Sequence, residues 1–69
     1  MFNKNVPSAI SGAGGAAKVA KALGISRVSV HEWIKKGSIP ANRVLSVEKV
    51  TGVSRHDLRP DIYPRESVA

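Results

Sequence analysis

Residues 26–37, SRVSVHEWIKKG, form the most informative segment of this chain. The segment begins with serine and ends with glycine, the residue types that best cap the two ends of a helix. At about 100° per residue, Val30, Trp33 and Ile34 share one narrow face of that helix. The segment therefore predicts an amphipathic helix whose opposite, outer face carries Val28, His31, Glu32 and Lys35.

A second helix is expected immediately before this one. Residues 16–23 are rich in alanine, which has the highest helix propensity. Small Ala20 suits a point where two helices nearly touch, Gly24 suits a left-handed turn, and the aliphatic side chains would fill the angle between the helices. Together these spacings form a helix-turn-helix pattern that uses Val19, Ala20, Leu23, Gly24, Ile25, Val30 and Trp33.

Proline and glycine positions set the bounds of the other helices, because proline favours a first helical turn and glycine a helix end. They predict one helix from Pro7 to the glycines at 12–15, and another from Pro40 to Gly52. A capping box that starts at Ser54 should begin a last short turn. The prediction is an all-α, compact domain of four to five helices.

The ends of the chain show no periodicity. We expect loose tails over residues 1–5 and 65–69 of a single domain that spans 1–69. Residues 61–64 should form an extended C-terminal tail, with Ile62 and Tyr63 either folded back on the core or offered to a partner.

The helix after Pro40 should close the core over Val30 and Trp33. Glu48 lies within its apolar face by angle, and burying an unpaired carboxylate is costly. Either Arg59 pairs with Glu48, or the carboxylate reaches water at the rim. The apolar face consists of Ala41, Val44, Leu45, Val47 and Val50.

Composition narrows the function classes. The chain has 69 residues, no cysteine, two histidines and a net charge of +6. Disulfides and thiolate metal sites are excluded, and we expect no metal, no cofactor and stability from packing alone. No apolar run is long enough to span a membrane and no hydrophobic signal core begins the chain, which favours a soluble protein of the bacterial or phage-infected cytoplasm.

The positive charge is concentrated in the middle of the chain. Residues 18–43 hold six lysines and arginines against a single acid, Glu32, whereas bases and acids balance from residue 44 onward. Such a segment is either a solvated basic face or a surface for a polyanion.

Enzymatic readings find little support. GAGGAA at residues 12–17 superficially fits a dinucleotide fingerprint, but that motif needs a preceding strand and a βαβ unit. A tight turn between helices explains the glycines more simply. Because no carboxylate pair, nucleophile motif or metal set is present, we expect no enzyme.

Several longer segments resemble one family. They are GGAAKVAKALGIS at 14–26, IPANR at 39–43 and TGVSRHDLRPDIYP at 51–64, with a tryptophan late in the second helix. They are similar to the small Cro-like repressors of phages and to the YdaS-type antitoxins, over about residues 10–64. The resemblance implies a sequence-specific DNA-binding regulator with a Cro- or lambda-repressor-like helix-turn-helix fold, and LRPDIYP is its most family-specific part. Ala16 departs from it, because many of these proteins carry there a glutamine that braces a phosphate contact.

Side-chain chemistry then assigns roles on the helix over residues 26–36 if it enters the major groove. Arg27 could bind guanine through two hydrogen bonds, Val28 could pack on a thymine methyl, and Glu32 could accept from cytosine. His31 could bind a base, a phosphate or neither. Basic side chains, hydroxyl and amide groups, and the free amides at helix N-termini bind phosphates. The residues predicted to contact the DNA backbone are Gly15, Ala16, Lys18, Ser26, Lys35, Lys36, Ser38, Asn42 and Arg43.

A domain of this size reads few base pairs, so we expect a homodimer, at least on a two-fold double-stranded DNA operator. The expected function is that of a Cro-like transcriptional repressor. The alternative is an antitoxin-like module that neutralises a partner toxin.

Overall fold

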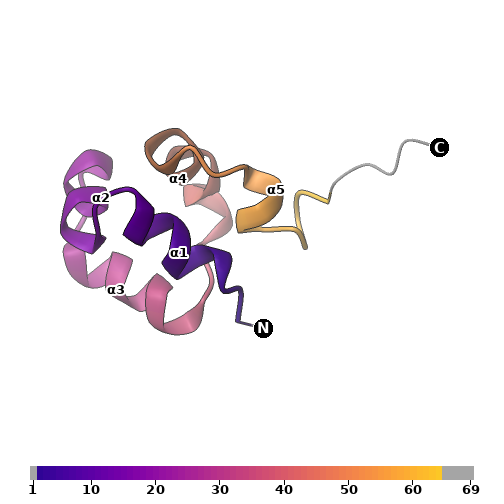
Figure 1. Cartoon of the computed structure of the whole chain (residues 1–69), viewed down its shortest axis with the longest axis horizontal. Helices are drawn as coiled ribbons and strands as arrows, with labels where there is room; N and C mark the ends of the chain where they lie inside the picture. The colour runs from indigo at the N-terminus through magenta and orange to yellow at the C-terminus, as the bar shows by residue number, and fades with distance from the viewer. Residues whose placement is uncertain (1, 65–69) are drawn as a thin grey trace.

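The computed structural model describes residues 2–64, which contain five α-helices, one short 3-10 helix and no strand. The all-α prediction is confirmed, and Figure 1 shows the helices gathered into one body. Helix α1 contacts each of the other α-helices, and α2 packs against both α3 and α4. The elements are α1 (Asn5–Gly12), α2 (Ala16–Leu23), α3 (Arg27–Lys36), η1 (Ala41–Arg43), α4 (Val44–Thr51) and α5 (Arg55–Leu58).

The turn between α2 and α3 is built as the sequence predicts. Gly24 has φ of 69° and ψ of 33°, in the left-handed region that favours glycine. The Ile25 amide then donates to the Ala20 carbonyl at 3.0 Å, which closes the C-terminal end of α2. Ser26 caps α3, because its Oγ accepts a hydrogen bond from the Val28 amide at 3.1 Å.

The core draws on every helix of this body. Val30 and Trp33 bury the inner face of α3, as expected, and Leu58 brings α5 into the same cluster. The larger side chains with no exposed surface come from all five α-helices and from the loop after α3. They are Val6, Ile10, Val19, Val30, Ile39, Val44, Val47 and Leu58.

The apolar face predicted after Pro40 is too broad. Val44 and Val47 are buried, but Leu45 is 47% exposed and Ala41 is also exposed. The first turn after Pro40 is a 3-10 helix, whose residues advance by about 120° rather than 100°. This turn rotates Ala41 away from the core, and Leu45 points to solvent because it lies about 100° around α4 from Val44.

The partner predicted for Glu48 is wrong. Its Oε1 lies 3.4 Å from Nε of Arg55, and its Oε2 accepts from the Arg55 amide at 2.7 Å. The carboxylate thus receives the N-terminal end of α5, while Arg59 binds elsewhere. Ser54 also caps α5, since its Oγ accepts from the His56 amide at 3.2 Å.

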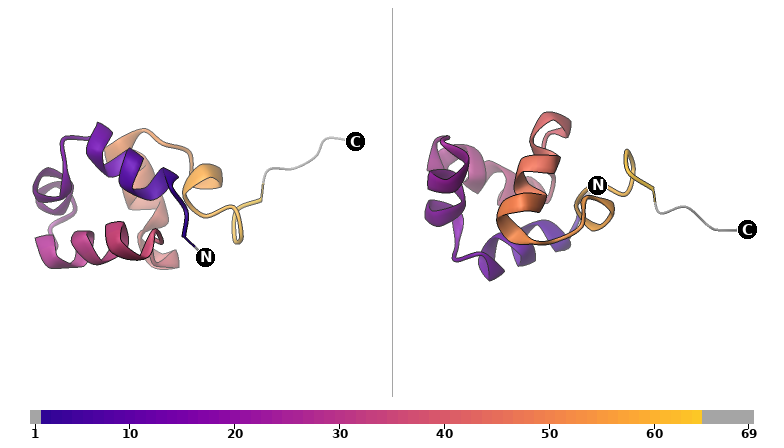
Figure 2. Two further views of the ribbon diagram at one scale, coloured as in Figure 1. Left: turned by 60° about the horizontal axis from the view of Figure 1, so that its bottom comes forward. Right: turned by 90° about the horizontal axis from the view of Figure 1, so that it is seen from above.

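The N-terminal residues are not a loose tail. The Asn3 amide donates to the Gly37 carbonyl at 2.8 Å, and Asn3 Nδ2 donates to the carbonyls of Asp57 and Leu58 at 2.8 and 3.0 Å. Asn5 is already the first residue of α1. Residues 2–5 therefore join the end of α3 to α5, and Figure 2 shows the N-terminus beside both elements.

The segment after α5 begins with a turn rather than an extended strand. The carbonyl of Arg59 accepts from the amides of Ile62 and Tyr63, at 3.2 and 2.8 Å. Tyr63 packs against the core and Ile62 is 42% exposed. The loose tail expected over residues 65–69 lies outside the described residues.

Candidate nucleic-acid interface

The outer face of α3 is exposed along its whole length. The structure places the predicted base-reading residues on this face, while Val30 and Trp33 fix the helix from below. Val28 is 68% exposed, the largest exposed fraction among the big apolar side chains of residues 2–64. The exposed residues of α3 are Arg27, Val28, His31, Glu32, Lys35 and Lys36.

Most polar side chains on this face are free to bind a ligand. Within residues 2–64, the side chains of Arg27, His31 and Lys35 make no hydrogen bond or ion pair. Lys36 Nζ lies 4.0 Å from Glu32 Oε2, one helical turn away, and both side chains are largely exposed. Such an exposed pair contributes at most about 0.5 kcal/mol to stability, so a ligand could separate it readily.

Ser38 lies next to the outer face of α3. It lines a shallow groove together with Glu32 and Lys36 of α3 and with Pro40. The Ser38 amide donates to the Trp33 carbonyl at 3.1 Å, which holds the loop against the helix end. The structure thus brings together three residues that the sequence assigns to DNA contacts.

The start of η1 carries two more of these residues. Asn42 is exposed and Arg43 is half-buried, and neither side chain has a partner among the described residues. The Arg43 amide donates to the Pro40 carbonyl at 2.9 Å, which starts η1 and fixes the backbone from which both side chains project.

The prediction for the N-terminus of α2 needs one correction. The Gly15 amide is not free for a phosphate, because it donates to the Ile10 carbonyl at 2.9 Å and closes the C-terminal end of α1. The amides of the first turn of α2, from Ala16 to Lys18, have no acceptor within residues 2–64. A free-amide anion site would therefore use Ala16 and its successors rather than Gly15.

Lys18 is held beside this helix end. A Cβ atom at Gly14 would overlap Cδ of Lys18, so the lysine stem packs directly over the glycine backbone. The φ of Gly14 is 108°, a conformation that side chains rarely adopt. This close approach gives the glycine cluster a structural role in placing the lysine.

Ion pairs leave the excess positive charge on the helix-turn-helix side. Arg55 pairs with Glu48, and Arg59 forms two hydrogen bonds with the carboxylate of Asp61. In contrast, Lys18, Arg27, Lys35 and Arg43 have no acidic partner among the described residues.

Sequence reasoning missed the contacts that fix the C-terminal end of α3. Phe2 packs over Gly37, where an added Cβ atom would overlap the ring. The φ of Gly37 is 63°, a conformation that also favours glycine. Arg59 Nη1 donates to the Ile39 carbonyl at 2.6 Å. The sequence places an arginine and an aspartate either side of Pro60, but it marks neither the Ile39 carbonyl nor Phe2.

Other kinds of site find no support in this part of the chain. No described helix is long and apolar enough to cross a membrane. Residues 2–64 bring together no group of three histidine, aspartate or glutamate side chains that could hold a metal ion.

Comparison with known proteins finds one family and one named relative. The model of a family described as "Bacterial toxin YdaS" matches residues 6–67. The chain belongs to the YdaS family. This YdaS-family chain is 38% identical over 63 residues to an Escherichia coli (strain K12) protein named "Putative transcriptional regulator YdaS". The alignment covers 87% of this chain and 64% of that protein, so the chain spans less than two thirds of the relative. No solved structure matches the chain.

Proposed function

We propose that this YdaS-family chain binds double-stranded DNA in a sequence-specific manner and acts as a Cro-like transcriptional repressor, with α3 in the major groove. The observation that carries the proposal is the outer face of α3. It combines unpaired Arg27 and His31 with the exposed Val28, on a helix held rigidly by a buried inner face. The name of the Escherichia coli relative supports a regulatory role, which would place the protein in the bacterial cytoplasm.

Base reading falls to the N-terminal and central part of the face. Arg27 has a free guanidinium, whose geometry suits O6 and N7 of guanine, and Val28 suits a thymine methyl. Glu32 would accept a hydrogen bond from cytosine and would repel phosphates where no cytosine is present. His31 stands between these positions and would bind a base or a phosphate.

Phosphate contacts flank the base-reading residues. They would come from the first turn of α2, from the N-terminal cap and the last turn of α3, and from the loop and η1 before α4. The proposed residues are Ala16, Lys18, Ser26, Lys35, Lys36, Ser38, Asn42 and Arg43.

Two copies of the chain would bind a two-fold operator. One recognition helix covers few base pairs, and useful specificity comes from two half-sites spaced by about one turn of DNA.

Selection from a randomised duplex library, followed by gel shifts at several salt concentrations, tests the proposal. We expect one sequence to be enriched and to bind at least about a thousandfold more tightly than random DNA. Binding should weaken steeply with salt, with a slope of about −0.9 per neutralised phosphate in a plot of log K against log salt. Salt-independent binding, or a library without enrichment, would reject it.

A role in a toxin–antitoxin pair is the second candidate. The family description names a toxin, and the exposed Leu45 and Ile62 offer apolar contacts to a protein partner. Growth of a bacterial host that produces either the wild type or Arg27→Ala separates the candidates. Growth arrest that persists in the variant would favour a protein target, and arrest that disappears would favour DNA.

A further inference from the structure

The loop after α3 is held through its carbonyl groups, two of which accept hydrogen bonds from remote segments and one from the turn that follows. Gly37 accepts from the Asn3 amide, Ile39 from the guanidinium of Arg59, and Pro40 from the Arg43 amide. This loop carries Ser38 and leads directly to Asn42 and Arg43, which are proposed to contact phosphates. Its conformation therefore decides where those side chains stand.

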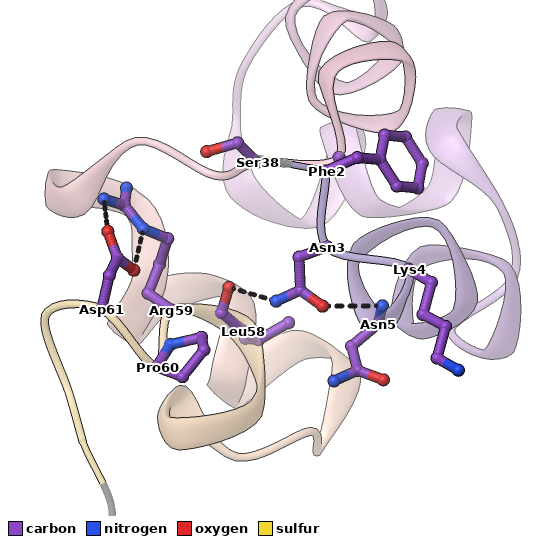
Figure 3. A pocket seen from close by; sticks show the side chains of 10 residues that line it. Phe2, Asn3, Lys4, Asn5, Ser38, Leu58, Arg59, Pro60 and Asp61 are labelled. Carbon is purple, nitrogen blue, oxygen red and sulfur yellow. Dashed lines mark hydrogen bonds and ion pairs between the residues drawn. The ribbon is translucent and has the colours of Figure 1, made fainter.

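Arg59 is itself locked in one orientation. Its Nε and Nη2 donate to the two carboxylate oxygens of Asp61 at 2.9 and 2.7 Å (Figure 3). Its Nη1 donates to the Ile39 carbonyl at 2.6 Å. Pro60 lies between the two charged residues, and the Arg59 carbonyl accepts from Ile62 and Tyr63. The turn after α5 thus presents to the loop a guanidinium whose orientation is already fixed by two parallel hydrogen bonds to Asp61. We call this Arg59–Asp61 pair the fork.

The charge of Arg59 is already neutralised. The arginine side chain is 20% exposed and the aspartate 61%, so the aspartate stands between the guanidinium and solvent. All the hydrogen bonds that Arg59 makes through its side chain go to Asp61 and Ile39. A direct phosphate contact would have to break this arrangement.

We infer that Arg59 and Asp61 act together as positioning residues, which fix the loop from Gly37 to Arg43 so that its side chains meet the DNA backbone. The inference rests on the proposed DNA-binding function. It assigns a role to the RPD part of the LRPDIYP segment, whose side chains form no hydrogen bond or ion pair with the proposed DNA-contacting side chains.

Asp61→Asn distinguishes positioning from simple electrostatics, because the two predict opposite signs. Removal of an acid should tighten DNA binding if charge alone matters. Positioning predicts weaker binding, by about tenfold, because asparagine offers Arg59 one acceptor oxygen instead of two and no opposite charge. The probes are a duplex selected by the wild type from a random library and a random-sequence duplex. Both should bind more weakly, with their ratio unchanged.

Two further variants complete the experiment. Arg59→Lys keeps the positive charge but cannot form the fork, so we expect the same loss, whereas a direct phosphate contact would tolerate lysine. Glu48→Gln is the matched control, because it also removes an acid from an arginine pair but lies away from the loop. It should bind both duplexes at least as tightly as the wild type.

Amide hydrogen exchange in the free proteins gives a readout that does not need DNA. Exchange at Arg43 should accelerate by about tenfold in Asp61→Asn and Arg59→Lys, while the core amide of Val47 keeps its wild-type rate. Unchanged exchange at Arg43, or tighter binding by Asp61→Asn, would overturn the inference. If the wild type selected no DNA sequence, the proposed function would fail, and exchange alone would still decide whether Arg59 orders the loop.

Discussion

The two ends of α3 are held in different ways. At the N-terminal end, the cap comes from Ser26 and the turn from Gly24, both adjacent in sequence. At the C-terminal end, Phe2 packs over Gly37 and Asn3 binds its carbonyl.

The difference separates two tasks. Local caps start the helix at a defined residue and can form as soon as the helix does. Contacts from the two terminal segments fix where the other end points, and they exist only when the whole chain is folded. The DNA-facing surface thus depends on residues far from it in sequence.

Val30→Asp should unfold the domain and so abolish the contacts at both ends of α3, which is the largest effect expected. Val30 has no exposed surface, and an unpaired buried carboxylate costs about 4 kcal/mol or more. A domain of this size has roughly 3 to 10 kcal/mol of stability in total, so we expect an unfolded chain by circular dichroism. Val28→Asp, on the exposed face of the same helix, should stay folded. A folded Val30→Asp would contradict the assigned core.

Gly37→Ala compares the two ends directly with Gly24→Ala. Both glycines have a left-handed backbone conformation, which reduces the free energy of unfolding by about 1 to 2 kcal/mol when alanine must adopt it. Only at Gly37 would the new Cβ overlap the ring of Phe2, so we expect a total loss of about 2 to 4 kcal/mol there. Urea denaturation measures both. Phe2→Ala in the Gly37→Ala background should recover part of the lost stability, because the overlap is relieved. Equal losses at both glycines would show that Phe2 does not pack over Gly37.

Arg27→Ala and Lys36→Ala compare the two ends in DNA binding. Arg27→Ala should lose about 1 to 3 kcal/mol on the selected duplex and relax one base position. Lys36→Ala should weaken all sequences alike and reduce the salt slope by about 1. Gel shifts on selected and random duplexes measure both. Indistinguishable effects on the two duplexes would show that the division between base reading and phosphate contact is wrong.

Ser26→Ala tests the local cap. The Val28 amide loses its side-chain acceptor, and we expect a loss of about 1 kcal/mol in the free energy of unfolding. Ser26→Asp should retain most of the stability, because aspartate is also a good cap. An unaffected midpoint in Ser26→Ala would mean that α3 is held from its other end alone.

The smallest effect expected is a pH dependence at the remote end. The hydrogen bond from Arg59 lowers the pKa of Asp61 to about 2, from an ordinary value of 3.8. A lowered pKa stabilises the folded state above about pH 4, and this contribution is lost as the pH falls toward 2. The Tm difference between wild type and Asp61→Asn should therefore shrink over this range. A constant difference would show that the carboxylate charge does not matter.

Local features of the fold could be predicted from the sequence. The bounds of α2 and α3 follow from Gly24, Ser26 and Gly37, and the buried positions of α3 follow from its periodicity. The side chains on the outer face of α3 are exposed as predicted, although their contacts with DNA remain proposals.

Remote contacts could not be predicted in the same way. Asn3 and Arg59 bind backbone carbonyls, which every residue possesses, so no sequence pattern marks their partners. The angular position of Glu48 showed that it needed a partner, but Arg55 and Arg59 lie one turn apart in sequence and only the fold separates them.

The contacts of Asn3 also bear on the order of folding. Its Nδ2 joins residues 54 and 55 positions away, which makes the chain a nearly closed ring. Closing a long loop costs more conformational entropy than closing a short one, so contacts between neighbouring helices form more readily. We expect α2 and α3 to dock first and the ring to close last, so that Asn3 prolongs the lifetime of the folded protein without hastening its formation.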